Sequence, residues 1–160
     1  MDTEPLVGHL AAWNYFMSVD TEVNEEFVET WQSFIKSDKR VTNDPMEAHY
    51  IGFNMWAQAV TNAGTTDAEA VQDALIGVSV PNLSGGYSTM LPNHHITKPV
   101  LIGEIQDDGQ FDIVWETTGL VAGDAWSNYL PESAKLFSSW SKPFSCGAFN
   151  VETKKCSGGN

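Results

Sequence analysis

Basic residues are scarce in this sequence. Its 160 residues include eight Lys and Arg against 21 Asp and Glu, which gives a formal net charge of −13. Binding to nucleic acid or to an anionic membrane surface needs a basic footprint, so this composition argues against both partners. It is compatible with a neutral or cationic small ligand.

Long apolar runs are also missing, and cysteine is rare. No run approaches the roughly 18 residues that a membrane span needs, and the first ten residues have no signal-peptide pattern. Cys146 and Cys156 are the only cysteines, and both lie in a tail rich in Gly, Ser and Lys. Their separation predicts a disulfide that closes a small loop in an oxidising compartment. The alternative is two unpaired thiols.

Signatures of catalysis are absent from the sequence. It contains no GxSxG, P-loop, GxGxxG or HExxH motif. The adjacent His94 and His95 lack a third ligand at a suitable spacing, so a polar loop is the favoured interpretation. The segment 107–109, Asp-Asp-Gly, is better explained as a hairpin turn than as a calcium loop. We therefore expect no enzyme activity, cofactor or metal site.

The longest helical pattern covers residues 45–63. Asp44 can cap it, Pro45 suits its first position, and Gly64 can end it. Its apolar residues leave no wide polar stripe, so we expect other elements to cover nearly all of its sides.

Two more helices flank this segment. Residues 24–38 form an amphipathic pattern that Asn24 can cap, and residues 67–76 follow a capping box of Thr66 and Glu69. Short links predict that the three helices pack as neighbours. Four aromatic residues are expected in the core between the first two helices: Trp31, Phe34, Phe53 and Trp56.

Strand patterns lie on both sides of the helices. Residues 7–15 are consistent with a strand or extended crossing segment, and residues 99–116 predict a β-hairpin that turns at 107–109. No period continues beyond residue 117, so residues 137–160 are expected to form an extended, irregular tail. The predicted fold class is α/β.

Three residues are candidates for contact with a ligand. Tyr50 and His49 lie near the start of the central helix, where a Tyr can place its ring in a cleft wall and turn its hydroxyl toward a ligand. Trp13 ends the first extended segment. The alternatives are a core tyrosine bonded to the backbone and a tryptophan packed within the strand.

Several long segments resemble the C-terminal part of urea and short-chain-amide substrate-binding proteins of ABC transporters. They include GHLAAWNYFMSVDTEVN, EAHYIGFNMWAQAVTNAG and NHHITKPVLIGEIQDDGQFDIVWETTGLVAGDAWS. The family is the type I periplasmic binding proteins. Its members are more than twice as long as this chain, so the resemblance implies a partial type I fold in residues 1–136.

The resemblance also implies a function. It predicts non-catalytic capture of urea or another small amide in the periplasm and delivery to a membrane permease. Tyr50 matches an aromatic position that faces the ligand in this family. Trp13 falls in the family's crossing segment beside the cleft, and its implied ligand contact is less specific. Surfaces that lack their usual partners predict a homo-oligomer. Two other readings stay open: an oligomeric α/β interaction module without a small ligand, and a hydrolase acting on amides.

Overall fold

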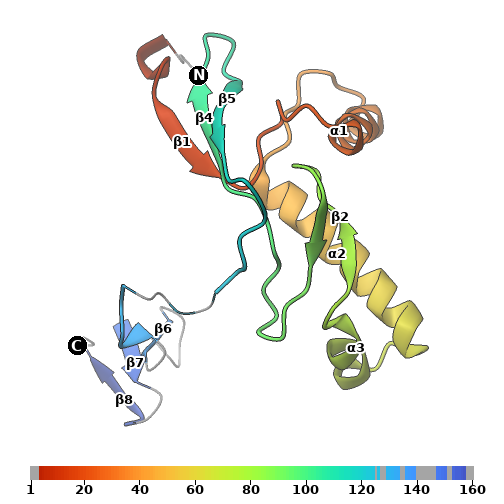
Figure 1. The fold of residues 1–160 in the computed structure, drawn as a ribbon, viewed down its shortest axis with the longest axis vertical. Coiled ribbons are helices and arrows are strands. Elements are labelled where there is room, and N and C mark those ends of the chain that lie inside the picture. Colours follow the sequence, from red (N-terminus) through yellow and green to blue (C-terminus); the bar gives the residue numbers. More distant parts are fainter. Residues whose placement is uncertain are drawn as a thin grey trace. The chain divides into compact units, whose positions relative to one another are not determined.

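The helix α2 (Asp44–Ala63) is the longest element of the computed structural model, in which α1 (Glu22–Ile35) precedes it and α3 (Ala68–Leu75) follows. The structure describes residues 4–124, 126, 129–133, 136–139, 147–150 and 153–157. The chain divides into two compact units, residues 1–123 and 124–160. All three expected helices are present (Figure 1).

The capping residue of each helix lies one to three positions from the residue expected. Thr21 accepts a hydrogen bond from the backbone N–H of Asn24, and Asn43 and Asp67 cap α2 and α3 in the same way. The predicted caps Asn24, Asp44 and Thr66 were therefore wrong. The N-terminal misplacement has a simple cause, because neighbouring residues of the same capping type compete for one position. Helix α1 also ends earlier than residue 38, since Lys36 adopts a left-handed conformation.

The sheet in the first unit has three antiparallel strands in the order β1–β4–β5. It consists of β1 (Leu10–Trp13), β4 (Leu101–Ile105) and β5 (Phe111–Glu116). The predicted hairpin is confirmed, with β4 and β5 joined across the turn at residues 106–110. A short 3₁₀ helix, η1 (Glu4–Leu6), precedes β1. A second hairpin, β2 (Ser79–Pro81) with β3 (Tyr87–Thr89), packs beside α2.

A single narrow stripe of α2 is buried. Its members are spaced four residues apart: Glu47, Ile51, Met55 and Ala59. The last three join Val71 of α3 and Val78 and Val80 near β2 in one hydrophobic cluster. Packing against α3 and one hairpin therefore covers only one side of the helix.

The expectation that α2 is covered on nearly all sides was therefore wrong. Phe34 is 79% exposed, Phe53 64% and Trp56 44%, so the predicted aromatic core between α1 and α2 does not form among these residues. Phe53 and Trp56 instead contact each other, as do Trp31 and Phe34. Helix α1 reaches α2 through the rings of Phe27 and Tyr50, whose centroids are 4.8 Å apart.

The second unit contains three short antiparallel strands where an irregular tail was expected. They are β6 (Leu136–Ser139), β7 (Gly147–Asn150) and β8 (Lys155–Ser157). Strands of three or four residues rich in Ser and Gly carry too short an alternation to be recognised from sequence. Cys146 lies outside the described residues and the side chain of Cys156 is not described, so the disulfide stays a prediction.

No helix among the described residues combines the length and the hydropathy that crossing a membrane requires. The predicted α/β class is confirmed: helices and small sheets share the first unit, and every strand pairing in the described residues is antiparallel.

Adjacent residues of α2 test this burial pattern. Met55→Ala should lower the free energy of unfolding by about 2–5 kcal/mol, because it opens a cavity in a fully buried position. Trp56→Ala removes a half-exposed ring and should cost about 1 kcal/mol or less. Denaturation by guanidinium chloride measures both. Equal losses for the two variants would contradict the single buried stripe.

Candidate functional site

The hydroxyl of Tyr15 is the centre of a buried hydrogen-bond network. It donates to Oδ1 of Asn24 at 2.8 Å, and its oxygen lies 2.6 Å from Oγ1 of Thr42. A phenol has one proton, so Thr42 is the donor in the second bond. Burial raises the pKa of Tyr15 to about 12, while the bond to Thr42 lowers it and the charge of Glu47 raises it. The network joins the end of β1 to α1 and to the segment before α2.

Asn24 extends this network into the loop between β1 and α1. Its amide nitrogen donates to the carbonyl oxygens of Met17 at 2.9 Å and Val19 at 2.7 Å. The side chain is buried, and both of its polar atoms have partners. It therefore holds the loop of residues 16–19 against the first turn of α1.

Two phenylalanines close the side of the network that faces the sheet. The rings of Phe16 and Phe111 lie 4.4 Å apart at an interplanar angle of 32°. Gly103 of β4 permits this packing, because a Cβ at this position would lie 3.0 Å from the Phe16 ring and from the Phe111 side chain. Ser18 also donates a hydrogen bond to the carbonyl oxygen of Phe111.

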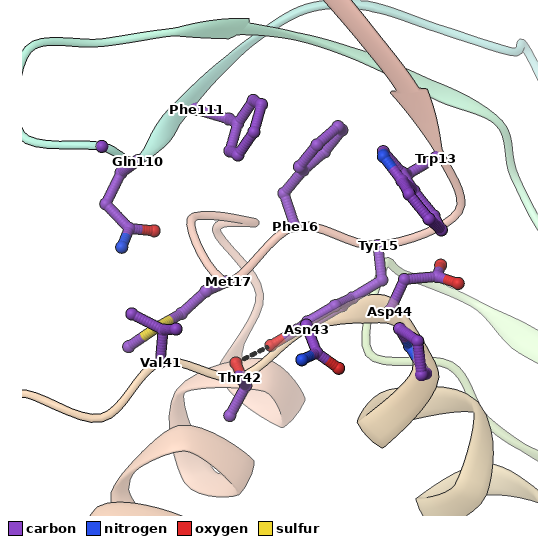
Figure 2. Close-up of a pocket in the computed structure, with 12 residues that line it drawn as sticks. Trp13, Tyr15, Phe16, Met17, Val41, Thr42, Asn43, Asp44, Gln110 and Phe111 are labelled. Carbon is purple, nitrogen blue, oxygen red and sulfur yellow. Dashed lines mark hydrogen bonds between the residues drawn. The ribbon is translucent and has the colours of Figure 1, made fainter. Parts of the chain in front are cut away.

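A cavity of about 440 Å³ lies between these elements, within the range of small-molecule sites. The end of β1, the segment into α2 and the turn before β5 supply its lining: Trp13, Tyr15, Phe16, Met17, Val41, Thr42, Asn43, Asp44, Pro45, Gly109, Gln110 and Phe111. Figure 2 shows the rings of Trp13, Phe16 and Phe111 on the sheet side and Thr42, Asn43 and Asp44 on the helix side. We call it the aromatic cavity.

One lining residue has a buried oxygen that lacks a hydrogen bond. Oδ1 of Asp44 is inaccessible to solvent and has no partner among the described residues. The neighbouring groups are engaged: the Thr42 hydroxyl bonds to Tyr15, and Oδ1 of Asn43 accepts from the backbone of Met46 at 3.1 Å. Buried polar atoms are nearly always paired, so this oxygen is an exception among the described residues.

A buried ion pair lies next to the aromatic cavity. Lys98 donates to one carboxylate oxygen of Glu47, which is fully buried, and the other oxygen of Glu47 has no partner among the described residues. Burial raises the pKa of Glu47, the bond and the charge of Lys98 lower it, and the charge of Asp44 raises it further. The pair links α2 to the segment that leads into β4.

The structure separates the three residues that the sequence suggested for ligand binding. Trp13 lines the aromatic cavity. Tyr50 is 44% exposed and lines a different hollow of about 550 Å³, together with Val23 of α1 and Val80 of β2. His49 is exposed, and Nδ1 of its ring bonds to the carbonyl of Pro45 at 2.6 Å.

Sequence reasoning missed Tyr15, Asp44 and Phe111 as site residues. The run Trp13-Asn14-Tyr15 contained a signal for the first, because it ends an extended segment with two aromatic rings. Asp44 was interpreted only as a helix cap, and Phe111 only as a strand residue. Their shared cavity depends on contacts across about 100 positions of the chain.

The histidine pair behaves as a polar loop. His94 occupies a left-handed turn conformation, and the ring of His95 lies 3.2 Å from the carbonyl of Asn93. No three His, Cys, Asp or Glu side chains in the described part of the chain lie close enough to hold a metal ion.

A family model described as "Periplasmic binding protein domain" matches residues 1–132. A limonene hydroxylase from Geobacillus stearothermophilus is 32% identical over 117 residues, which are 73% of this chain and 21% of that protein. The chain therefore spans about a fifth of that relative.

Solved structures of solute-binding proteins share the fold. One from Rhodopseudomonas palustris, in complex with 3,4-dihydroxybenzoic acid, has a TM-score of 0.62 and 16% identity over 72% of this chain. A leucine-binding protein from Thermotoga maritima has a TM-score of 0.59 and 18% identity over 71%. The chain spans 32% and 31% of these proteins, respectively.

The Tyr15 hydroxyl offers a direct test of the network. Tyr15→Phe should lower the free energy of unfolding by about 1–3 kcal/mol at pH 7, because it leaves Oδ1 of Asn24 buried without a donor. Folded Tyr15 keeps its proton to about pH 12, and unfolded Tyr15 loses it near pH 10.0. The wild-type chain therefore loses stability as the pH rises from 10 to 12, and the gap to the variant narrows.

Denaturation curves at several pH values measure this gap. Tyr87→Phe is the matched control, because Tyr87 is 61% exposed and its hydroxyl is outside the network. A Tyr15→Phe variant as stable as Tyr87→Phe would show that the network contributes nothing.

Proposed function

Because this chain belongs to the periplasmic binding protein domain family, we propose that it forms part of a solute-binding component of an ABC importer. In this role the protein captures a small molecule and does not convert it. The observation that carries the proposal is the aromatic cavity, which joins sheet and helix residues around a volume suited to a small ligand. The chain spans about a third of the solved relatives, so the remainder of a binding cleft would come from other residues of a longer protein.

We propose urea or another small neutral amide as the solute. Several relatives were solved with hydroxybenzoic acids, whose carboxylates are anionic. An anion would meet the Asp44 carboxylate in the aromatic cavity and a net charge of −13 on the chain. A neutral amide is repelled neither by the Asp44 carboxylate nor by the net charge, and its N–H groups are hydrogen-bond donors.

The family also supports a setting for the longer protein. We propose that it works in the periplasm and delivers its ligand to a membrane permease. A disulfide between Cys146 and Cys156 would suit that oxidising compartment. The hydroxylase name of one relative does not alter this proposal, since this chain corresponds to only 21% of that protein.

A second proposal is that this chain associates with itself, as an oligomeric α/β module. Three exposed aromatic residues favour it: Phe34, Phe53 and Trp56. The outer edges of β1 and β5, which pair with no other strand among the described residues, offer further surface for association. Self-association and solute capture are compatible, because these side chains do not line the aromatic cavity.

Titration with acetamide or urea tests the proposed site. We expect dissociation constants in the millimolar range or weaker, because the cavity is only part of a cleft. Shifts of the backbone N–H signals of Thr42 and Asn43, which line the cavity, would report binding in NMR spectra. Trp13→Ala should abolish it, and Tyr50→Ala should leave binding to this chain unchanged, because Tyr50 lines the other hollow. If Tyr50→Ala alone lost binding, the site would lie at the hollow beside α1.

Light scattering on a size-exclusion column tests self-association. We expect a dimer or a larger oligomer, and Phe53→Glu should shift it toward monomer by placing a charge on the exposed aromatic surface. Leu120→Glu is a matched control, because Leu120 is 44% exposed and lies outside α1, α2 and the strand edges. A monodisperse wild-type monomer would contradict this second proposal.

A further inference from the structure

Gly103 lies in the middle of β4, on the face of the sheet that borders the aromatic cavity. Side chains alternate between the two faces of a strand, and residues directly opposite each other on neighbouring strands share a face. Ala11 of β1 and Ile113 of β5 lie opposite Gly103, and Trp13, two residues after Ala11, lines the cavity. A side chain at position 103 would therefore stand on the same face as Trp13.

Space, and not backbone conformation, accounts for the glycine at this position. The φ angle of Gly103 lies outside the left-handed region, so its backbone does not call for glycine. Glycine inside a strand lowers stability and often marks the close approach of another group. Here a Cβ would lie 3.0 Å from Cε2 and Cζ of the Phe16 ring and 3.0 Å from Cβ of Phe111. Carbon atoms pack best at about 3.5–4.0 Å, so these neighbours would have to move.

The cavity lies on the side to which the two rings would move. Phe16 is buried, its ring packs against that of Phe111, and both residues line the aromatic cavity. Figure 2 shows the two rings between the strands of the sheet and the residues at the start of α2. Because the strand side of the rings is closely packed against β4, a side chain at position 103 would displace them into the cavity.

We propose that Gly103 is a positioning residue that sets the size of the solute that the aromatic cavity accepts. Without a side chain, it lets the rings of Phe16 and Phe111 lie against β4 and leaves the space in front of them to the apolar body of a solute. This inference rests on the proposed function and adds a size limit to it. Gly103 does not line the cavity and acts through the two rings.

Two probes that differ only in the length of their hydrocarbon measure this limit. Butyramide carries two more methylene groups than acetamide, and burying both against the rings should make it bind the wild-type chain about tenfold more tightly. NMR titrations of the full chain give both dissociation constants. The backbone N–H signals of Thr42 and Asn43 are the reporters, because these residues line the cavity and belong to the segment before α2 rather than to β4.

Gly103→Ala and Gly103→Val reduce the space in two steps. The affinity ratio of butyramide to acetamide should fall to about three in the alanine variant and about one in the valine variant, since the first excludes about one methylene group and the second excludes both. Acetamide should change little. Gly119→Ala and Gly119→Val are matched controls, because a Cβ at Gly119 meets nothing within 4 Å and its φ angle is not left-handed. Both should keep the wild-type ratio.

Phe16→Leu in the Gly103→Ala background assigns the effect to the ring. Leucine lacks the ring carbons Cε2 and Cζ that the new Cβ would meet, so the double variant should recover the wild-type ratio. Two independent losses of stability would add instead of cancelling. The double variant also decides the case in which alanine alone prevents folding: recovery of the fold and of the ratio supports the inference, and recovery of neither contradicts it.

The outcomes separate this inference from the proposed function. If butyramide and acetamide bind the wild-type chain equally, or if both Gly103 variants keep the wild-type ratio, Gly103 sets no size limit and the inference fails while solute capture survives. If Phe16→Leu does not restore the ratio, the rings do not transmit the effect and the inference fails as well. If neither probe binds the wild-type chain, the aromatic cavity is not a solute site and both proposals fail.

Discussion

The buried hydroxyl of Tyr15 is the contact on which the first unit depends. Three segments distant from one another meet at this oxygen: the end of β1, the first turn of α1 through Asn24, and the entry to α2 through Thr42. A polar group buried in this way is costly unless it is paired, so the three segments must keep their mutual position for the fold to be stable. The aromatic cavity is formed where they meet.

The ion pair of Glu47 and Lys98 makes a second junction, between α2 and the segment before β4. Buried ion pairs contribute little net stability, but removing one partner leaves a buried charge without compensation. Glu47 occupies the first position of the stripe that continues through Ile51, Met55 and Ala59. One face of α2 therefore connects the sheet to the helical core, and the opposite face is left to solvent in this chain.

Exposed aromatic side chains lie on both α1 and α2. The chain spans about a third of the related solved structures, and Phe34, Phe53 and Trp56 are large apolar side chains with little cover. Apolar surface of this kind is usually a contact surface. These side chains do not line the aromatic cavity, so the physical demands of solute capture and of association do not conflict.

Much of the secondary structure was determined by local sequence. Periodicity placed the three helices, and the Asp-Asp-Gly turn placed the β4–β5 hairpin, because turn and helix preferences act between residues close in the chain. The helix caps were off by one to three positions, since adjacent residues such as Asn43 and Asp44 can both cap.

Tertiary structure alone decided which side of α2 is buried. An apolar side chain carries no information about whether a partner will cover it, and Phe53 and Met55 are equally apolar in the sequence. The aromatic cavity could not be predicted from the sequence either, because local sequence does not show which distant segments meet. Its walls come from residues 13–17, 41–45 and 109–111. The Tyr15 network, the pairing of β4 with β1 and β5, and the contact of Phe16 with Phe111 bring these separate segments to one place.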